Sequence, residues 1–432
     1  MEIKGTPRQG LWGATLGFFF GFASVALFGP TAKLFQDVME LTPTMVALLV
    51  AMPALSGSLL RIPFAASVEN NGGRKPFLIL LGLSLLGMLG LTVLVWTKYP
   101  EGLTQSYYPL LLLFGLLCGC GIATFSVGIG QVAYWFPKGS QGKALGVFGG
   151  GGNLAPGIFS FVLPIALTRL GLGVSYVVWL GILAVGLGVY FLMGRNAWYF
   201  QYRAAGAEPD LARRNAEAAG QEIFPAGSSL ESLKVSARTW KTWALVAIYF
   251  TTFGGFIALT AWFPTFWRES FGLSAVLAGA FTGAYSLLTS ILRIPGGSVA
   301  DRFGGENTVM ASLALMVVGA GCLSFTSALG LAGAGAALMA AGMGVANAAT
   351  FKLVAQEVPQ AIGGAAGWVG GLGAFGGFAI PPAMGWLVRL HGTAGYAEGF
   401  LCFIVLGVAA LCIAWVLSRK GAARLRPAPI TA

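Results

Sequence analysis

The sequence predicts an all-α membrane protein with twelve transmembrane helices arranged as two pseudo-symmetric halves of six. Three observations support this fold class. Of the 432 residues, 56% are hydrophobic and only 9% are charged, whereas soluble domains carry about 25% charged residues. The apolar residues form repeated runs of about 20, the length at which a helix crosses the bilayer core. Motifs from the first half of the chain also recur in the second half.

The apolar runs form two sets of six, separated by one long polar stretch. We expect membrane-spanning helices at residues 11–34, 42–66, 76–97, 106–136, 142–168, 172–195, 241–266, 273–300, 307–328, 331–357, 362–388 and 395–418. The sequence therefore predicts three parts: an N-terminal six-helix half at 1–195, a cytoplasmic linker at 196–240, and a C-terminal half with a short tail at 241–432.

The distribution of basic residues predicts the orientation. Of the 26 Lys and Arg residues, 19 lie on the side that holds both termini and the linker. Two lie within spans, and five lie on the opposite side: Lys33, Lys98, Arg169, Arg268 and Arg389. Because Lys and Arg accumulate in cytoplasmic loops, we expect a multi-pass protein of the cytoplasmic (inner) membrane with both termini in the cytoplasm.

The two halves repeat each other around Arg61 and Arg293. Residues 58–63 read Ser-Leu-Leu-Arg-Ile-Pro, and residues 290–295 read Ser-Ile-Leu-Arg-Ile-Pro. The same register aligns Glu69 with Asp301. A second repeat aligns glycines of the fifth and eleventh spans, namely Gly149, Gly150 and Gly152 with Gly370, Gly371 and Gly373. Repeated halves of this kind predict a substrate site at their interface, near the bilayer midplane.

Arg61 and Arg293 are the residues most indicative of function. Each lies eight residues before the aligned acidic position, which is about 12 Å into the membrane at the helical rise. A charge at this depth is costly and faces a cavity or a partner. An ion pair with a buried carboxylate is the alternative, but no Asp or Glu lies at mid-depth in the predicted spans. We therefore predict an anionic substrate, and the flat guanidinium group suits a small planar oxyanion.

Other chemistries find little support. The net charge is +11, but the basic residues lie between the apolar runs and do not cluster in one soluble module. We therefore expect no nucleic-acid partner. All five cysteines lie inside apolar runs, where they are typical packing residues, and the single histidine, His391, lies in an expected loop. The sequence has no Cys/His, Ser/His/Asp or metal-ligand constellation. We therefore expect no enzyme, no catalytic residue, no metal and no cofactor.

The six aligned glycines allow two interpretations. Small residues let helix backbones approach closely, and in that case the glycines serve packing alone. Alternatively, they form smooth surfaces that slide during a conformational switch and leave room beside the arginines.

The loops that follow the two arginines resemble the loop signature of the major facilitator superfamily. In that superfamily, acidic and basic residues latch helix ends on the cytoplasmic side between two access states. The matching residues are Glu69, Arg74, Asp301 and Arg302. The first copy departs from the signature at Asn70 and Asn71.

Longer motifs resemble the nitrate/nitrite porter family of this superfamily, over nearly the whole chain. They are Leu-Leu-Arg-Ile-Pro at 59–63, Phe-Pro-Lys-Gly-Ser-Gln-Gly-Lys-Ala-Leu-Gly at 136–146, Gly-Gly-Gly-Gly-Asn-Leu-Ala-Pro-Gly at 149–157 and Gly-Gly-Leu-Gly-Ala-Phe-Gly-Gly-Phe-Ala-Ile-Pro at 370–381. The resemblance implies the major facilitator fold and a secondary transporter that moves nitrate and nitrite by alternating access.

The resemblance also implies the substrate-binding residues. The family's substrate arginines correspond to Arg61 and Arg293. Its signature asparagine corresponds to Asn153, and its pore aromatics correspond to Tyr249, Phe253, Phe125 and Phe22. The chemistry agrees, since aromatic rings can sandwich a flat anion while tyrosine and asparagine donate hydrogen bonds. Taken singly, each aromatic residue is also typical of packing.

Several alternatives stay open. Nitrate/nitrite exchange and proton-coupled uptake both fit the arginine pair. Lys352, near the cytoplasmic end of the tenth span, either snorkels to the interface, adds positive potential there or takes part in proton coupling. The substrate could instead be oxalate, formate or cyanate. A membrane sensor without flux is a further alternative, but its usual appended soluble domain is missing. We expect a monomer surrounded by membrane lipid.

Overall fold

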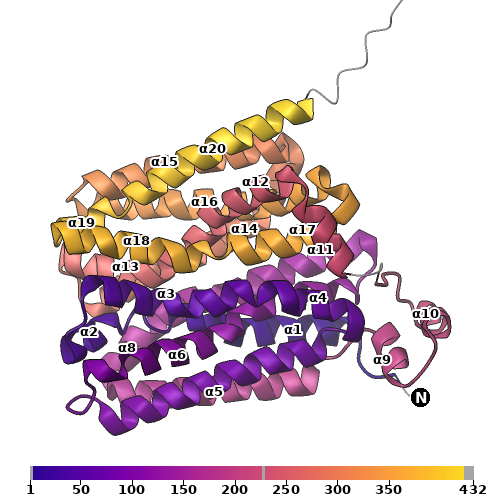
Figure 1. Cartoon of the computed structure of the whole chain (residues 1–432), viewed down its shortest axis with the longest axis horizontal. Coiled ribbons are helices and arrows are strands. Elements are labelled where there is room, and N and C mark those ends of the chain that lie inside the picture. Colours follow the sequence, from indigo (N-terminus) through magenta and orange to yellow (C-terminus); the bar gives the residue numbers. More distant parts are fainter. Residues whose placement is uncertain (1–2, 226–228, 423–432) are drawn as a thin grey trace, which may run out of the picture.

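The computed structural model describes residues 3–225 and 229–422, and within these residues it contains helices and no strands. The long helices run side by side in a common direction (Figure 1). Helices up to Met193 gather on one side of the molecule, and helices from Trp240 onward gather on the other. The predicted linker and C-terminal tail extend into segments outside the described residues.

The helices of the first set are α1 (Pro7–Phe22), η1 (Ala23–Ala26), α2 (Ala32–Met39), α3 (Pro43–Leu59), α4 (Arg61–Asn71), α5 (Arg74–Lys98), η2 (Gln105–Tyr107), α6 (Tyr108–Gly119), η3 (Cys120–Ala123), α7 (Thr124–Ala133) and α8 (Lys138–Met193). Three short helices follow: α9 (Trp198–Ala204), α10 (Pro209–Ala218) and α11 (Ser229–Ala237). These short helices and the start of α1 lie at one end of the molecule, which we call the linker end (Figure 1).

The helices of the second set are α12 (Trp240–Tyr249), η4 (Phe250–Gly254), α13 (Gly255–Phe271), α14 (Ala275–Phe303), α15 (Gly305–Phe325), α16 (Leu329–Glu357), η5 (Pro359–Ala361), α17 (Ile362–Trp368), η6 (Val369–Gly373), α18 (Gly376–His391), α19 (Ala394–Glu398) and α20 (Leu401–Ala422).

Local sequence signals define several helix ends. Thr6 and Thr42 each precede a proline, and each hydroxyl accepts a hydrogen bond from the backbone amide three residues later, at 3.3 Å. This is the expected start of a helix. At the linker end, α4 and α14 end at Gly72 (φ 74°) and Gly304 (φ 87°). Glycine adopts such positive φ values without steric cost. Gly72 and Gly304 each lie 11 residues after one of the two arginines, so α4 and α14 end at matching positions of the sequence repeat.

Ten helical segments of the described residues are long and apolar enough to cross a membrane, compared with the twelve predicted. Two features account for the difference. The predicted fifth and sixth spans count as one segment, because both lie in α8, although the backbone leaves helical geometry between them at Gly171 (φ 75°, ψ 173°). The predicted first span, in which η1 follows the 16 residues of α1, is not among the ten.

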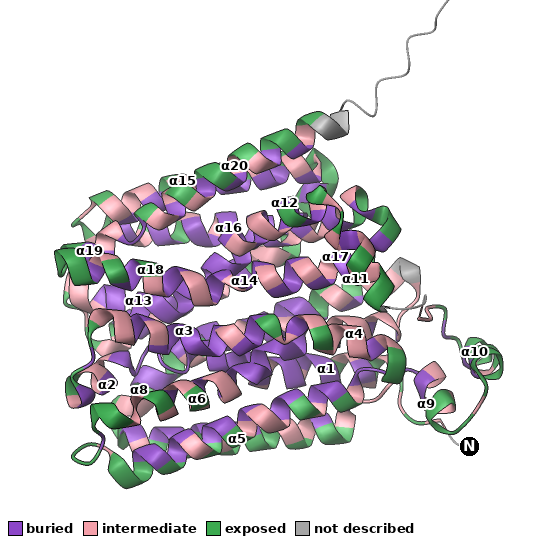
Figure 2. Cartoon of the chain, in the orientation of Figure 1, coloured by how far each residue is buried: buried purple, intermediate pink, exposed green. Residues whose placement is uncertain are grey.

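Buried residues concentrate where the two sets of helices face each other, while the outer faces of α5 and α20 are exposed (Figure 2). The exposed side chains on these outer faces are themselves apolar, for example Trp96, Val405 and Trp415. Extensive exposed apolar surface marks contact with a membrane. The burial pattern therefore agrees with a multi-pass membrane protein.

The two sets of helices pack most closely at the end opposite the linker. There α8 lies against α14, and a Cβ atom added at Gly279 would lie only 2.5 Å from the Ser160 carbonyl oxygen. Lys33 and Glu269 form an ion pair between the sets at 3.7 Å. Toward the linker end, by contrast, Gly146 of α8 has no neighbour within 4 Å of an added Cβ. The interface is closed at one end and open at the other.

Candidate functional site

Four interruptions of regular α-helix surround the predicted site. In the first set, η1 follows Phe22 directly, and η3 ends two residues before Phe125. In the second set, η4 contains Phe253, and η6 contains three of the aligned glycines. Both η4 and η6 are π-helices, which occur frequently at functional sites. Irregular backbone at membrane depth is tolerated only inside protein or along a cavity, so these interruptions are expected beside a buried site.

Arg61 is fully buried, and its guanidinium group donates to three backbone carbonyls. Nε donates to Gly57 (3.0 Å), Nη1 to Gly370 (3.0 Å) and Nη2 to Ile122 (3.4 Å). Gly370 belongs to η6 and Ile122 to η3, so two of the helix interruptions supply acceptors. Carbonyl oxygens satisfy the donors but carry no full negative charge. The positive charge of Arg61 therefore has no anionic partner among the described residues, and Arg61 also links the two sets of helices.

Arg293 is half-buried and has fewer partners than Arg61. Its Nη2 donates to the Tyr249 hydroxyl at 3.4 Å, while its buried Nη1 has no hydrogen-bond partner. Among the described residues, neither arginine forms an ion pair with a carboxylate. An unsatisfied buried donor is costly, and it is the feature expected of a group that binds a ligand.

Phe125 and Phe253 lie against both arginines. The Arg61 guanidinium carbon is 5.0 Å from the Phe125 ring centroid and 5.1 Å from that of Phe253. For Arg293 these distances are 5.5 and 5.4 Å. The two rings are 6.0 Å apart with an interplanar angle of 25°. Cations attract ring faces within about 6 Å, so the rings help to hold two like charges near each other.

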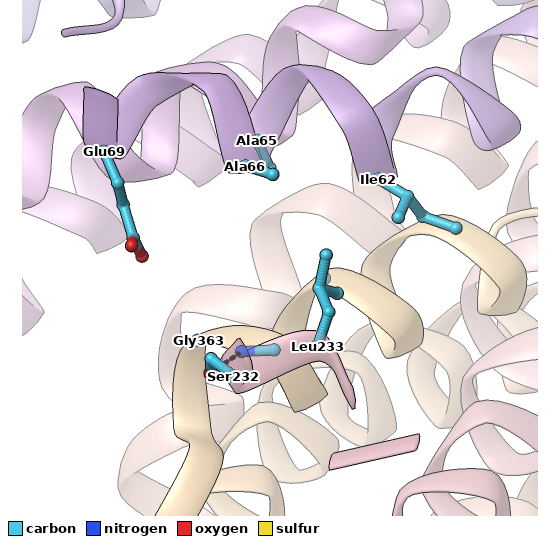
Figure 3. A pocket seen from close by; sticks show the side chains of 9 residues that line it. Ile62, Ala65, Ala66, Glu69, Ser232, Leu233 and Gly363 are labelled. Carbon is cyan, nitrogen blue, oxygen red and sulfur yellow. Dashed lines mark hydrogen bonds between the residues drawn. The ribbon is translucent and has the colours of Figure 1, made fainter. Parts of the chain in front are cut away.

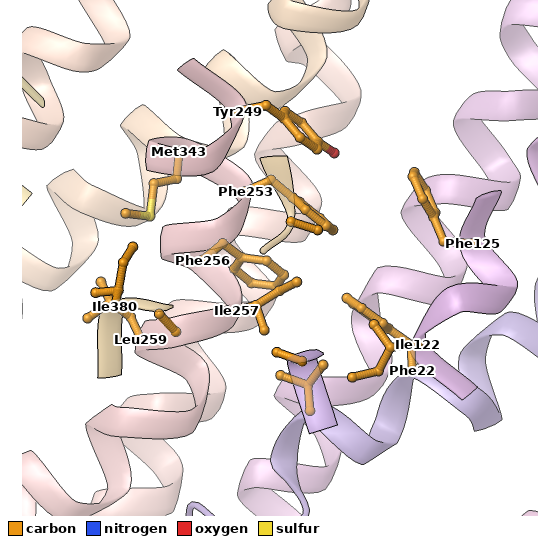
Figure 4. Packing of buried hydrophobic residues seen from close by; sticks show 14 of the residues in the cluster. Phe22, Ile122, Phe125, Tyr249, Phe253, Phe256, Ile257, Leu259, Met343 and Ile380 are labelled. Carbon is orange, nitrogen blue, oxygen red and sulfur yellow. The ribbon is translucent and has the colours of Figure 1, made fainter. Parts of the chain in front are cut away.

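Tyr249 and Phe22 extend this aromatic arrangement on either side of Phe253 (Figure 4). The Tyr249 ring stacks on Phe253 at 4.9 Å, and the Phe22 ring lies parallel to Phe253 at 6.3 Å. All three side chains are fully buried. The structure thus gathers six of the seven predicted substrate-binding side chains in one cluster: Arg61, Arg293, Phe125, Phe253, Tyr249 and Phe22.

Asn153 is the seventh, and its recorded contacts are with backbone rather than with the arginines. Its Nδ2 donates to the Gly149 carbonyl at 2.7 Å, and its buried Oδ1 has no partner. Its own carbonyl accepts a hydrogen bond from the Ser290 hydroxyl at 2.8 Å. This bond joins α8 to α14 at Ser290, which lies three residues before Arg293.

A cavity of about 630 Å³ runs from Arg293 and Phe125 toward the linker end, where Lys143 of α8 lines it. Asn347 of α16 also lines this cavity, and its buried Oδ1 has no hydrogen-bond partner. The sequence prediction missed Asn347. The sequence feature that could have indicated Asn347 is its polar amide side chain among small apolar residues of the tenth predicted span.

The aligned glycines fall into three kinds of contact. A Cβ added at Gly150 would lie 3.3 Å from the Ile294 side chain, and one added at Gly371 would lie 2.6 Å from Ile62. Both contacts cross between the two sets of helices, and each isoleucine directly follows one of the two arginines.

The other four aligned glycines do not make this crossing contact with an isoleucine. Gly152 and Gly373 pack within their own sets, where an added Cβ would lie 1.8 Å from Phe18 and 2.7 Å from Tyr249. Gly149 and Gly370 are less crowded, with nearest atoms at 4.0 and 3.7 Å. Gly370 instead contributes its carbonyl oxygen to Arg61.

The predicted latch residues lie at the linker end but make different contacts from one another. Arg74 donates to the carbonyls of Gly194 (2.8 Å) and Phe191 (2.9 Å), which ties α5 to the end of α8. Asp301 forms an ion pair with Lys352 at 2.8 Å. The Arg302 guanidinium carbon lies 5.3 Å from the ring of its neighbour Phe303.

Glu69 borders a cleft between α4 and the pair α11 and α17 (Figure 3). The linker helix α11 is fixed to α17 by two hydrogen bonds. The Gly364 amide donates to the Ser232 hydroxyl at 2.9 Å, and Trp368 Nε1 donates to the Leu233 carbonyl at 3.0 Å. The linker thus contacts the second set of helices next to the cavity mouth.

Comparison with known proteins agrees with this arrangement. The family model described as Major Facilitator Superfamily matches residues 14–381 and 277–432. The "Probable nitrate transporter NarT" of Staphylococcus epidermidis is 27% identical over 415 residues, which cover 94% of this chain and 95% of that protein. The "Probable nitrate/nitrite transporter NarK2" of Mycobacterium tuberculosis is 30% identical over 365 residues, with 83% and 84% covered.

Among solved structures, the xylose transporter XylE of Escherichia coli, in a partially occluded inward open conformation, is similar with a TM-score of 0.69 at 14% identity. The match covers 95% of this chain and 99% of that one, and at this identity it concerns the fold alone. With the family model spanning nearly the whole chain, this protein belongs to the Major Facilitator Superfamily.

Proposed function

We propose that this protein is a secondary transporter that moves nitrate and nitrite across the cytoplasmic membrane by alternating access. The observation that carries the proposal is the pair of arginines, which flank two aromatic rings and have no carboxylate partner among the described residues. The names of the relatives, which are nitrate and nitrite transporters, point to the same substrates. The protein acts as a transporter and not as an enzyme.

The proposed architecture has twelve membrane helices in two pseudo-symmetric halves, at 1–195 and 241–432. It counts α8 as two spans separated at Gly171 and α1 with η1 as the first span. The repeated motifs around the arginines support the pseudo-symmetry. The excess of basic residues on the linker side supports placing that end, with both termini, in the cytoplasm.

The proposed binding mode follows from the hydrogen-bond capacity of the cluster. Arg293 Nη1 has no partner, and the Tyr249 hydroxyl, which accepts from Arg293, still has its own proton to donate. Phe125 and Phe253 present ring faces beside both guanidinium groups. A flat anion with several oxygen acceptors can therefore bind between the arginines and relieve their mutual repulsion. Guanidinium is well suited to planar, bidentate recognition of such an anion.

Binding of the anion is proposed to promote rocking of the two halves through Arg61. Its Nη1 donates to the Gly370 carbonyl of the opposite half. An anion that takes this donor releases the link to η6, and the crossing contacts at Gly150 and Gly371 then permit the halves to slide. Because binding favours one arrangement over another, the anion shifts the population of states.

We favour nitrate/nitrite exchange over proton-coupled uptake. Lys352 is the titratable candidate for proton coupling. It forms an ion pair with Asp301 and does not line the cavity of about 630 Å³. Exchange needs only that one anion replace another between the arginines, so it requires no titratable group in the site.

Uptake of labelled nitrate into proteoliposomes, with competing anions outside, tests the proposed substrate. We expect nitrite to compete strongly, and oxalate, formate and cyanate to compete weakly or not at all. Oxalate uptake without nitrate uptake would assign the site to a different anion. A well-folded protein that moves no anion would instead favour a membrane sensor.

A further inference from the structure

The cavity on the linker side divides into two branches that differ in size and in lining residues. The larger branch, of about 630 Å³, and a smaller one, of about 140 Å³, share Phe125, Ile129, Phe351 and Ala366 as lining residues. The charged residues that line the larger branch are Arg293 and Lys143. The charged residue that lines the smaller branch is Glu69.

Lys143 stands out within the larger branch. It is exposed, lies on the cavity wall formed by the first turns of α8, and is in the same wall as Gly146 and Gly150. Among the described residues, no ion pair or hydrogen bond is recorded for its ammonium group. It lies seven residues before Gly150, so it is displaced about 10 Å along the helix from the contact with Ile294.

We propose that the anion crosses the cytoplasmic half of the protein through the branch lined by Lys143, and that Lys143 recruits it from the cytoplasm. This inference rests on the proposed function and adds a route and a residue to it. The route carries positive charge at both ends, at Lys143 and at Arg293, and it is the wider of the two branches.

The physical basis is electrostatic focusing. A cleft with apolar walls and charge of one sign raises the local concentration of the opposite ion and speeds its entry. The walls between Lys143 and Arg293 consist largely of small and apolar residues: Gly142, Leu145, Gly146, Val147, Gly149 and Ala348. An anion in this branch is therefore attracted at the mouth without a strong competing site on the way. Lys143 raises capture and does not form the binding site, so its effect falls with ionic strength.

The test compares Lys143→Gln with wild type in membrane vesicles of both orientations, using nitrate as the probe. Everted vesicles present the cytoplasmic face. There we expect the KM for nitrate to rise about threefold at low ionic strength, with kcat unchanged, and the difference to disappear at high salt. In right-side-out vesicles the KM should equal that of wild type. Lys143→Arg should restore the wild-type KM in everted vesicles.

Lys75→Gln is the matched control. Lys75 is also exposed and lies near the linker end, in the first turn of α5, but it does not line either branch. Its substitution removes the same charge and should leave the KM unchanged. An unchanged KM for Lys143→Gln in everted vesicles would overturn the inference, as would an equal rise for both variants. Absence of nitrate flux in wild-type vesicles would instead overturn the proposed function.

Discussion

Arg61 and Arg293 differ in how their guanidinium groups are satisfied. Arg61 is enclosed by the carbonyls of Gly57, Ile122 and Gly370, whereas Arg293 retains an unpaired Nη1 beside the cavity. Arg293 is therefore the arginine that an anion entering from the linker side meets with a donor already available. In the proposed binding mode, Arg61 contributes only when its bond to Gly370 is exchanged for one to the anion.

Replacing either arginine with lysine should abolish most nitrate transport although the charge is kept. Lysine cannot present two parallel donors to a planar anion. Loss of a charge-assisted hydrogen bond costs about 1.5–3 kcal/mol, so uptake should fall about tenfold or more. Initial rates of nitrate uptake into proteoliposomes measure this.

The two variants should differ in stability, and this serves as the control. Arg61→Lys loses bonds that join two helix interruptions, so its melting temperature should fall. Arg293→Lys loses one long bond to Tyr249 and should melt close to wild type. Normal uptake by a well-folded Arg293→Lys protein would contradict the assignment of Arg293 to the anion site.

At the scale of helices, the site depends on where regular helix stops. The π-helix η6 and the short helix η3 supply carbonyls to Arg61, and the π-helix η4 supplies the Phe253 ring that lies against both arginines. Two glycines, Gly150 and Gly371, allow the crossing contacts with Ile294 and Ile62 that lie beside them. We therefore propose that these glycines matter for the movement of one half along the other, and less for the stability of either half.

Gly150→Leu and Gly371→Leu should reduce turnover severely while the protein still folds. A leucine at either site would fill the space that the crossing isoleucine occupies, so the halves could not close on the linker side. The matched control is Gly188→Leu in the same helix α8, where an added Cβ has no neighbour within 4 Å. Uptake rates relative to the amount of folded protein measure the effect. Full activity of both site variants would reduce these glycines to packing residues.

The linker helix α11 gives a second prediction for a single element. A Cβ added at Gly364 would lie 2.1 Å from the backbone oxygen of Ser232, whereas one at Gly363 has its nearest atoms at 3.8 and 3.9 Å. Gly364→Ala should therefore displace α11 and expose the linker to limited proteolysis, while Gly363→Ala should not. Equal cleavage rates for the two variants would show that α11 is not held by this contact.

At the scale of the whole molecule, the two helix sets are closed at one end and open at the other. The Lys33–Glu269 pair and the α8–α14 contact hold the end opposite the linker, and the cavity reaches the linker end. If the linker lies in the cytoplasm, as we propose, this is an inward-facing arrangement. Transport then requires that the contacts at the end opposite the linker break while the two sets of helices close at the linker end.

Much of this organisation could be predicted, because the repeated motifs can be recognised directly in the amino-acid sequence. The Arg-Ile-Pro repeat locates two equivalent helix positions, and apolar run length locates most spans. The helix interruptions were not predicted, since η3 and η4 contain no proline, and their single glycines resemble those found within uninterrupted helices such as α5. For the same reason the carbonyl partners of Arg61 were not foreseen.

Two side-chain contacts also lay beyond the sequence. Asn347 reaches the cavity only because α16 turns that face toward α14, and Lys352 meets Asp301 across two helices. Apolar run length divided α8 into two stretches, and the backbone leaves helical geometry between them, at Gly171.

Counterflow of labelled nitrate tests the central claim most directly, since it requires one anion site that faces each side in turn. Wild-type protein in proteoliposomes loaded with unlabelled nitrite, at equal pH inside and outside, should take up labelled nitrate many times faster than in unloaded liposomes. Equal uptake rates with and without internal nitrite, or no uptake at all by folded protein, would contradict nitrate/nitrite exchange at the site between Arg61 and Arg293.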